Sequence, residues 1–275
     1  MGLLGKTRVP LNGRHYRHAL QPPFKTLHAW GRSGCELHFP LFTGHFFLRL
    51  SVLSPGTDCT TDCVLFDLDG TLADTAPDLV AALNSVLSSN DREEVELTTA
   101  RWWVAQGSIG LIQKSLHMTA EEANSSPYRQ QLLDAYASNV CVRTRLFSGI
   151  DCLLKRLESR QIPWGIVTNK PARFTTPLLN QLELERRAEV VVSGDTLRRA
   201  KPDPLPLLHA CEVIGVKPSN TVFVGDDQRD VLAGQAAGMA TVGVTWGYSR
   251  PEDAKSWGAR WIVSNTPELI KVLGI

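Results

Sequence analysis

Two aspartates separated by one residue are the clearest chemical feature of the sequence. Asp67 and Asp69 follow an apolar run at residues 63–66 and precede Gly70, a pattern that predicts a short buried strand ending in a turn. If the chain stays extended, both carboxylates point to the same side. Two carboxylates held together repel each other, and they stay ionised together only if a cation lies between them. The pair therefore indicates a cation site, and an Asp-Gly turn without chemistry is the weaker interpretation.

A second acidic cluster follows a later apolar run. Asp226, Asp227 and Asp230 come directly after residues 221–224, which have the composition of a buried strand. Carboxylate oxygens in this number suit Mg²⁺, which keeps several waters and shares its coordination shell with a substrate phosphate. We therefore expect Mg²⁺ as the cofactor and a small phosphorylated molecule as the substrate.

Three other polar side chains fit a phosphate group. Thr168 and Asn169 follow an apolar run at residues 163–167, and Lys201 lies in a loop before a helix that begins with proline. A phosphate brought beside carboxylates needs a neutralising charge and hydrogen-bond donors, which these residues can supply. Alone, Thr168 is ambiguous and Lys201 resembles an ordinary solvated lysine. The phosphate interpretation depends on their combination with the aspartates.

The elements that position these residues alternate along the chain. Strand patterns occur at residues 63–66, 163–167, 190–193, 221–224, 241–244 and 261–263, and helix patterns at 78–87, 152–160, 177–184, 204–214 and 230–237. Strands that alternate with helices predict an α/β fold, a doubly wound parallel sheet with helices on both faces. Ligands bind at the carboxyl ends of such strands. We therefore expect Asp67, Thr168 and Asp226 to meet at one edge.

One connection is too long for this pattern. Almost a hundred residues, mostly helical in pattern, separate the first strand from the next, although a crossover needs only about a dozen. We therefore expect residues 78–146 to form a separate helical domain, inserted into a core made of residues 62–77 and 147–275.

The first 57 residues differ in composition from the rest. They carry seven Lys or Arg and a single acid, Glu36, together with five of the seven histidines. They lack a signal-peptide cleavage pattern, and they lack the amphipathic periodicity of an organelle-targeting peptide. We favour an over-extended start to the chain, and we expect residues 1–57 to be a flexible extension.

Composition excludes several classes of protein. Hydrophobic residues make up 43% and charged residues 21% of the chain, which excludes a disordered protein. The net charge of +1 argues against nucleic acid as a partner, and no apolar run approaches the roughly 18 to 20 residues that span a membrane. The six cysteines contain no CxxC pair. Cys59 and Cys63 resemble half a zinc site, but reduced thiols in a cytoplasmic protein are the better interpretation.

Several segments together resemble a known family. Residues 67–71, 168–169, 201–202 and 225–230 resemble, in order and spacing, the four motifs of the haloacid dehalogenase (HAD) superfamily of phosphatases, and the resemblance covers residues 62–275. Further segments are similar to its phosphoglycolate phosphatase subgroup, at 72–78, 167–171 and 243–248. Others are similar to the neighbouring phosphatases of N-acetylmuramic acid 6-phosphate, at 147–149, 173–174 and 250–253.

The resemblance implies a role for each motif residue. Asp67 would be the nucleophile that forms an aspartyl-phosphate, and Asp69 the general acid and then base. Mg²⁺ would be held by Asp67, the backbone carbonyl of Asp69, and Asp226. Phosphate would be bound by Thr168, Asn169 and Lys201. Asp230 and Asp227 would lie next to the metal ligands and hold them in position without binding the metal themselves. The helical insertion would be a cap that closes over the site, with Gln106, Gly107 and Ser108 as its substrate-reading residues.

These implications favour a Mg²⁺-dependent phosphomonoester hydrolase of the cytoplasm. We expect it to convert 2-phosphoglycolate and water to glycolate and phosphate. A phosphatase of N-acetylmuramic acid 6-phosphate or another sugar phosphate is the alternative, and a phosphosugar mutase is a weaker one. A phosphoaspartate receiver or a dehalogenase fits less well. Both a monomer and a homodimer remain open.

Overall fold

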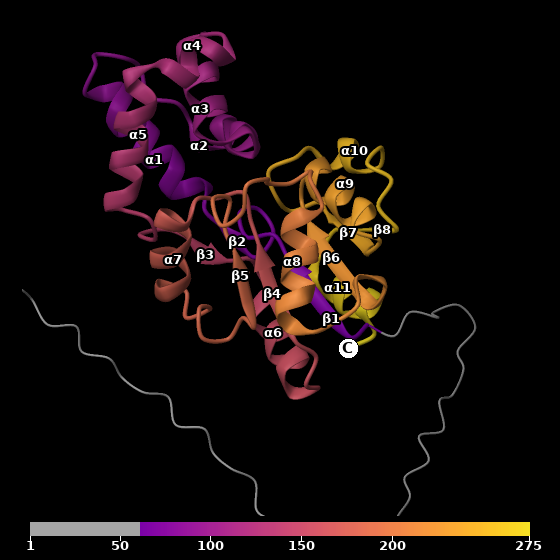
Figure 1. Ribbon diagram of the computed structural model, residues 1–275. Coiled ribbons are helices and arrows are strands. Elements are labelled where there is room, and N and C mark those ends of the chain that lie inside the picture. Colours follow the sequence, from indigo (N-terminus) through magenta and orange to yellow (C-terminus); the bar gives the residue numbers. More distant parts are fainter. Residues whose placement is uncertain (1–60) are drawn as a thin grey trace, which may run out of the picture. The chain divides into compact units, whose positions relative to one another are not determined.

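A parallel six-stranded sheet forms the centre of the computed structural model, which describes residues 61–275 (Figure 1). Its strand order is β5-β4-β1-β6-β7-β8, with β1 at Cys63–Phe66, β4 at Trp164–Val167, β5 at Val190–Val192, β6 at Thr221–Gly225, β7 at Ala240–Val244 and β8 at Trp261–Val263. The predicted α/β parallel-sheet fold is confirmed. The predicted extension at residues 1–57, and Cys59, lie outside the described residues.

Both faces of the central strand are buried. All four residues of β1 are inaccessible to solvent. Val64 and Phe66 belong to the apolar cluster on one face of the sheet, and Cys63 and Leu65 belong to the cluster on the other. Because neighbouring side chains of a strand point to opposite faces, a strand covered by helices on both sides has to be apolar throughout.

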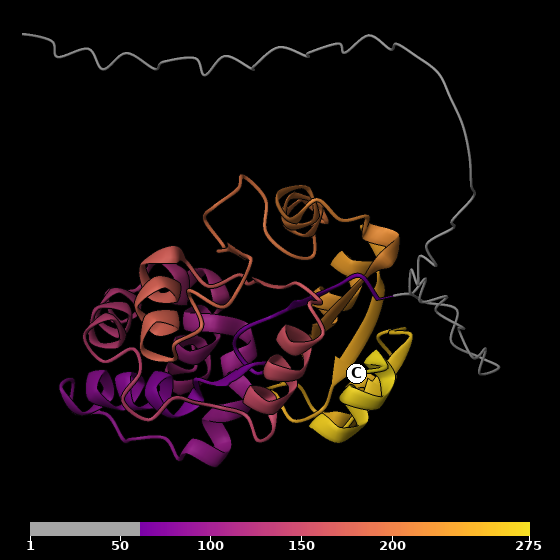
Figure 2. The same ribbon diagram turned by 90° about the horizontal axis from the view of Figure 1, so that it is seen from below.

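Helices cover both faces of this sheet (Figure 2). The cluster that contains Phe66 includes residues of α6, α7 and α11, whereas the cluster that contains Leu65 includes residues of α8 and α9. These helices span Ile150–Ser159 (α6), Ala172–Gln181 (α7), Leu205–Ile214 (α8), Gln228–Ala236 (α9) and Thr266–Leu273 (α11), with the short elements η2 at Pro218–Asn220 and α10 at Pro251–Ala254.

One predicted helix was placed wrongly. The sequence pattern indicated a helix that starts at Pro177, but α7 begins at Ala172 and continues through this proline. Proline cannot donate a hydrogen bond to the carbonyl of Arg173, one turn earlier. The helix tolerates this loss because Phe174, Leu178 and Leu179 are buried in the apolar cluster beside the sheet.

The register of the central strands brings their carboxyl ends level. Phe66 is paired with Ile166 of β4 on one side and with Val224 of β6 on the other. The residues that follow these strands therefore emerge at the same edge of the sheet. This is the reason why Asp67 and Asp226 lie close together.

The long connection after β1 is helical. It leaves the sheet through β2 at Ala73–Asp74 and returns through β3 at Arg145–Leu146, and these two strands pair antiparallel. The helices between them, called the inserted helices below, have an apolar cluster of their own. They are α1 at Ala76–Ser88, α2 at Leu97–Ala100, η1 at Arg101–Gln106, α3 at Gly107–Leu116, α4 at Ala120–Ser125 and α5 at Pro127–Ser138. The domain boundaries at 62–77, 78–146 and 147–275 stay a prediction.

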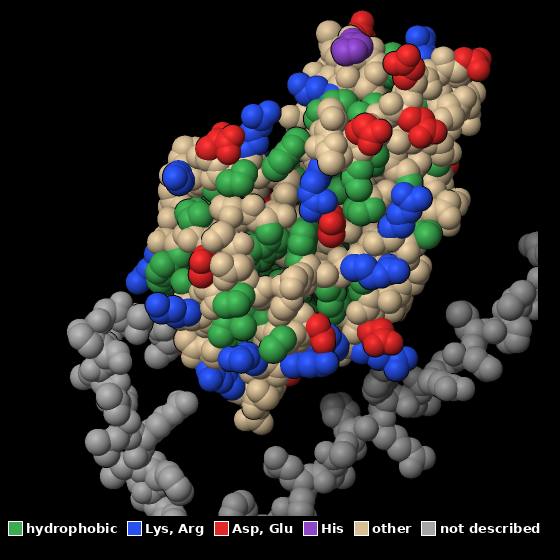
Figure 3. Space-filling view, turned by 180° about the vertical axis from the view of Figure 1, so that it is seen from behind, with side chains coloured by type: hydrophobic (Ala, Val, Ile, Leu, Met, Phe, Trp, Pro, Cys, Tyr) green, Lys and Arg blue, Asp and Glu red, His purple; other side chains and the backbone are tan. Residues whose placement is uncertain are grey.

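The described part of the surface carries both signs of charge. On the face shown in Figure 3, acidic and basic side chains are interspersed with hydrophobic ones. Within residues 61–275, no helix combines the length and the apolar character needed to cross a membrane.

Candidate active site

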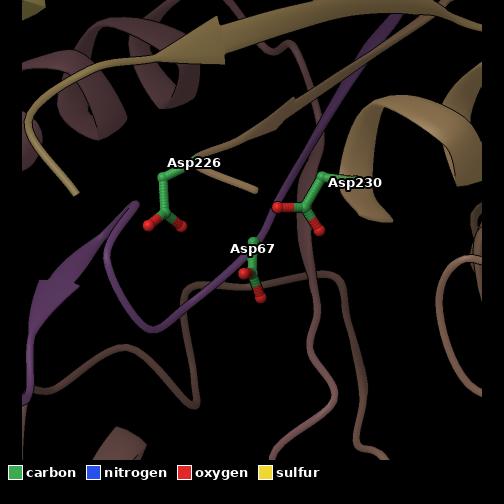
Figure 4. Close-up of side chains that lie close together, drawn as sticks. All are labelled: Asp67, Asp226 and Asp230. Atoms are coloured by element: carbon green, nitrogen blue, oxygen red, sulfur yellow. The ribbon is translucent and has the colours of Figure 1, made fainter. Parts of the chain in front are cut away.

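Three carboxylates converge at the carboxyl edge of the sheet (Figure 4). Asp67 follows β1, Asp226 follows β6, and Asp230 lies in the first turn of α9. One oxygen from each of the three lies within 4.8 Å of the others. Burial raises the pKa of Asp226 well above its usual value, and the neighbouring carboxylates of Asp67 and Asp230 raise it further. This concentration of buried negative charge favours a cation at the same place.

Glycines allow the chain to pass close to these carboxylates. A Cβ atom on Gly70 or on Gly247 would lie 2.2 Å from Oδ2 of Asp226, and one on Gly225 would lie 2.3 Å from Oδ2 of Asp230. Gly70 also has a φ of +82°, a conformation that other residues rarely adopt. Side chains at these positions would therefore displace the carboxylates from the cluster.

The donor set of this cluster fits a divalent metal ion. Oδ1 of Asp67 is buried, and its one polar contact within residues 61–275 is the ammonium of Lys201 at 2.8 Å. Asp226 is held in place by Thr71, whose hydroxyl donates to it over 3.1 Å, and by the amide of Tyr248, at 2.8 Å. Hard carboxylate oxygens that are close together, oriented and partly unsatisfied are the ligands that divalent cations of the Mg²⁺ type take.

Lys201 lies between two of the three carboxylates. Its Nζ is 2.8 Å from Oδ1 of Asp67 and 2.7 Å from Oδ1 of Asp230, and it also donates to the carbonyl of Val167. Burial by itself lowers the pKa of Lys201, but the two carboxylates outweigh burial and raise it. The lysine therefore stays charged, and it brings a buried positive charge to the side of Asp67.

Asn169 lines the cavity and also contacts the loop that carries Lys201. Its predicted role in phosphate binding stays a prediction, while both polar atoms of its side chain are bonded to the backbone of Lys201. Nδ2 donates to the carbonyl oxygen and Oδ1 accepts from the amide, each over 2.9 Å. These bonds let Asn169 position the loop that carries Lys201, and one N–H of its amide remains available. Thr168, which is buried, lines the cavity beside it.

Asp69 is held by two partners that differ from those of Asp67. Its Oδ1 accepts a hydrogen bond from the hydroxyl of Thr75 at 2.5 Å and from Nζ of Lys170 at 3.0 Å. Lys170 also lies over the ring of Tyr136, 4.6 Å from its centre. The sequence analysis singled out neither Lys170 nor Tyr136. The position of Lys170, directly after Thr168 and Asn169, was the one available signal.

Asp227 is paired away from the carboxylate cluster. It forms two hydrogen bonds with the guanidinium of Arg229, at 2.7 and 3.0 Å. Burial raises the pKa of Asp227, but its bonds with Arg229 outweigh burial and lower it. Arg229 also donates to the backbone carbonyl of Ala105, in the inserted helices. The pair therefore links α9 to η1.

A cavity of about 360 Å³ lies between the carboxylates and the inserted helices. Asp67, Asp69 and Lys201 line it at the edge of the sheet. On the opposite side it is lined by the three residues that the sequence predicted to read the substrate, and by residues of α5 that the sequence did not indicate: Gln106, Gly107, Ser108, Arg129, Leu133 and Tyr136. The structure thus brings the motif residues and the predicted cap residues to a single cavity.

The family model of the haloacid dehalogenase-like hydrolases matches residues 64–244, which include every motif described above. The chain belongs to this family. Its curated relatives are named phosphatases, and together with the family match they show that the chain is a phosphoric monoester hydrolase. The predicted family and reaction class are confirmed.

Two curated relatives show how similar these enzymes are. An N-acetylmuramic acid 6-phosphate phosphatase of Pseudomonas aeruginosa is 40% identical over 211 residues, which cover 76% of this chain and 93% of the relative. A phosphoglycolate phosphatase of Xanthomonas campestris is 41% identical over 208 residues, which cover 75% of this chain and 93% of the relative. The two names differ in substrate at nearly equal similarity, so similarity alone does not choose between them.

Solved structures share the same fold. A predicted phosphoglycolate phosphatase from Haemophilus somnus aligns with a TM-score of 0.69 at 27% identity, and covers 78% of this chain and 99% of its own. A predicted phosphatase from Clostridium acetobutylicum aligns with a TM-score of 0.63 at 25% identity, and covers 78% of this chain and 98% of its own.

Proposed function

We propose that this HAD-like hydrolase is a Mg²⁺-dependent phosphatase of a phosphorylated carboxylic acid and that it works through an aspartyl-phosphate on Asp67. One observation carries the proposal. Asp67 lines the cavity, and its buried Oδ1 contacts only the ammonium of Lys201 among residues 61–275, while one of its oxygens lies within 4.8 Å of the carboxylates of Asp226 and Asp230.

The two aspartates of the first motif then divide the reaction between them. Asp67 attacks the phosphorus atom, and the bond between phosphorus and the ester oxygen breaks. Asp69, which Thr75 and Lys170 orient, gives its proton to the leaving oxygen. In the second step Asp69 takes a proton from water, and the resulting hydroxide attacks the phosphorus and releases phosphate and free Asp67.

The residues around this pair supply charge and orientation. Asp67, Asp226 and the backbone carbonyl of Asp69 would hold Mg²⁺, which when bound neutralises charge on the phosphoryl oxygens. The carboxylate of Asp230 already contacts Lys201 and accepts a hydrogen bond from the amide of Asp227. These contacts support its assignment as a residue that positions the metal ligands without binding the metal itself. Lys201 and Thr168 would bind the phosphate.

The inserted helices, taken as residues 78–146, would be the cap. They line the cavity opposite Asp67 and contact the core through the bond from Arg229 to the carbonyl of Ala105. A cap of this kind excludes water from the site and contributes the side chains that read the remainder of the substrate.

Cavity size favours the larger of two candidate substrates. A cavity of 360 Å³ has room for about a dozen waters, since each occupies roughly 30 Å³ in the liquid. The two-carbon acid of 2-phosphoglycolate would fill little of this space, whereas N-acetylmuramic acid 6-phosphate, a sugar acid, would fill most of it. We therefore place N-acetylmuramic acid 6-phosphate first. We keep 2-phosphoglycolate second, because a relative with that substrate in its name is 41% identical.

We place this reaction in the cytoplasm. The four cysteines among residues 61–275 are free thiols: Cys63, Cys141, Cys152 and Cys211. Free thiols are typical of reducing compartments.

A phosphate-release assay tests the proposal. The full-length chain with Mg²⁺ should release inorganic phosphate from N-acetylmuramic acid 6-phosphate with the highest kcat/KM, then from 2-phosphoglycolate, and slowly from p-nitrophenyl phosphate. Phosphate should appear in proportion to the ester consumed, which separates a phosphatase from a mutase. A chain that releases phosphate from none of these esters would contradict the proposal.

Two experiments test separately whether Asp67 is the nucleophile and whether the reaction needs a metal. Asp67→Asn should lower kcat by about a thousandfold or more, because the amide of asparagine is too weak a nucleophile to form the phosphoenzyme. Excess chelator should stop the wild-type reaction and added Mg²⁺ should restore it. Near-normal turnover by Asp67→Asn would refute the nucleophile, and full activity in chelator would refute the metal.

A further inference from the structure

Most of the positive side chains that line the cavity are already paired. Lys201 contacts Asp67 and Asp230, Lys170 contacts Asp69, and Arg229 contacts Asp227. Two arginines differ. Arg129 and Arg173 also line the cavity, but neither forms an ion pair with any residue in the described range 61–275. The cavity therefore contains positive charge that the described protein does not neutralise.

Arg129 is the better oriented of these two arginines. It is half-buried, and its Nε donates to the hydroxyl of Ser108 over 3.2 Å. This bond fixes the guanidinium while the amino groups at its end remain available for a ligand. Arg173 is exposed and stacks on the neighbouring ring of Phe174. A guanidinium in a fixed position binds a carboxylate through two parallel hydrogen bonds.

A second polar group in the same cavity lacks a partner. Tyr136 is 1% exposed, and its hydroxyl forms no hydrogen bond of regular geometry within residues 61–275, although the ammonium of Lys170 lies beside it. Burial raises the pKa of this hydroxyl to about 12, so that it is neutral and can donate. Buried polar groups in proteins nearly always have partners. A buried, unpaired hydroxyl in the lining of a cavity therefore points to a ligand.

These two residues lie on one face of α5. Arg129, Leu133 and Tyr136 are spaced by four and three residues, the spacing that places side chains on the same side of a helix, and all three line the cavity. With a rise of 1.5 Å per residue, the Cα atoms of Arg129 and Tyr136 are about 10 Å apart along the axis. The helix face thus offers two polar contacts with an apolar residue between them.

The orientation of α5 places Tyr136 at the end of the helix that is near Lys170 and Asp69. The carboxyl end of the helix leads back to the core through β3 (Figure 1). Tyr136 lies there against Lys170, which in turn contacts Asp69. Arg129 lies two turns further from the core. In 2-phosphoglycolate only three bonds, about 4 Å, separate phosphorus from the carboxyl carbon. A ligand that contacts both Tyr136 and Arg129 along this helix is therefore better matched by a longer acid than by 2-phosphoglycolate.

We propose that Arg129, held by Ser108, binds the carboxylate of a phosphorylated sugar acid whose ring lies along α5, with Tyr136 donating to an oxygen of that ring. The inference rests on the proposed function, and it names the residues that read the substrate. N-acetylmuramic acid 6-phosphate has the required shape, since its phosphate and its lactyl carboxylate extend from opposite sides of the sugar ring. Leu133 would contact the ring between the two polar residues.

The test compares two esters that differ only in the carboxylate-bearing group. N-acetylglucosamine 6-phosphate is N-acetylmuramic acid 6-phosphate without the lactyl ether. The full-length wild type should prefer the sugar acid. Arg129→Met should lower the ratio of the two kcat/KM values about tenfold to hundredfold, because hydrogen bonds to a charged group are lost. Tyr136→Phe should lower kcat/KM for both esters together, because both have the ring.

A charge-matched control and a milder variant complete the series. Lys114 is exposed on α3, outside the cavity, and Lys114→Met should leave the ratio at the wild-type value. Ser108→Ala keeps the arginine but removes its hydrogen-bond partner, and should lower the ratio by a smaller factor. This variant tests the inference even if Arg129→Met does not fold, which thermal melting will show.

The outcomes separate the inference from the proposed function. A wild type that hydrolyses both sugar esters equally well, or an Arg129→Met variant that keeps the wild-type ratio, would overturn the carboxylate site and leave the phosphatase intact. If Arg173→Met lowered the ratio of the two kcat/KM values and Arg129→Met did not, the carboxylate site at Arg129 would also be overturned and the phosphatase function would stand. A wild type that hydrolyses no ester, p-nitrophenyl phosphate included, would overturn both.

Discussion

At the scale of single residues, the site depends on a lysine that is shared by two acids. The side chain of Lys201 is 2% exposed and lies within 2.8 Å of carboxylate oxygens of both Asp67 and Asp230. Removing a charge from water is costly, and in the interior only a close partner offsets that cost. Lys201 therefore stabilises the fold at the same time as it places a positive charge beside Asp67, the proposed nucleophile.

Replacing this lysine should affect stability and activity together. Lys201→Met keeps most of the side-chain volume but leaves two buried carboxylates without their cation, so that the free energy of unfolding should fall by about 3 to 5 kcal/mol. Phosphate release should be largely lost. Denaturant unfolding and steady-state kinetics measure the two effects.

Lys217 provides the matched control for this change, since it is exposed and forms no ion pair within residues 61–275. Lys217→Met should match the wild type in both measurements. Wild-type stability in Lys201→Met would show that the two carboxylates do not need the lysine.

At the scale of elements, one tyrosine joins the core to the first inserted helix. The hydroxyl of Tyr248 accepts hydrogen bonds from the amides of Thr75 and Ala76, at 2.6 and 2.9 Å, and donates to Asp74 at 3.0 Å. The side chain of Thr75 does not cap α1, so that Tyr248 satisfies amides that the helix start leaves unpaired. The amide of Tyr248 also holds Asp226.

Loss of this hydroxyl should loosen the junction between the two parts. Tyr248→Phe leaves two buried amides without an acceptor, which should lower the free energy of unfolding by about 1 to 3 kcal/mol. Denaturant unfolding checks this value. Tyr128→Phe, at a half-buried tyrosine of α5, is the control and should change little. If both variants unfolded at the wild-type denaturant concentration, Tyr248 would have no such capping role.

At the scale of the whole molecule, every residue assigned to the site lies between Asp67 and Tyr248. The sheet, the inserted helices and the cavity are all formed within residues 61–275. The extension at residues 1–57 therefore stays a prediction of the sequence, and its removal tests that prediction directly.

A chain that starts at residue 58 should keep its fold and its activity. Its kcat/KM on the preferred ester and its melting temperature should equal those of the full chain, because the site residues and their partners are all retained. Kinetics and thermal melting of both chains, purified side by side, provide the measurement. A shortened chain that is inactive or aggregates would show that the first 57 residues are needed.

Features that depend on local pattern could be predicted from the sequence. Short apolar runs followed by polar residues located the strands and placed Asp67, Thr168 and Asp226 at their ends, because parallel strands bring their carboxyl ends to one edge. The prediction was wrong for the helix that contains Pro177, where burial of apolar side chains outweighed the hydrogen bond that proline cannot make.

Which distant side chains meet could not be predicted from the sequence and follows from the fold. The pairs formed by Lys170 with Tyr136 and by Arg129 with Ser108 join positions that no periodicity relates. The same is true of Asn169, whose amide turns to the backbone of Lys201 thirty-two residues later. Such contacts depend on how whole helices pack and on the cost of leaving a buried polar group unpaired, and neither is a property of a sequence window. The proposed nucleophile is therefore visible in the sequence, whereas the contacts of Arg129 and Tyr136, which we propose to read the substrate, appear only in the fold.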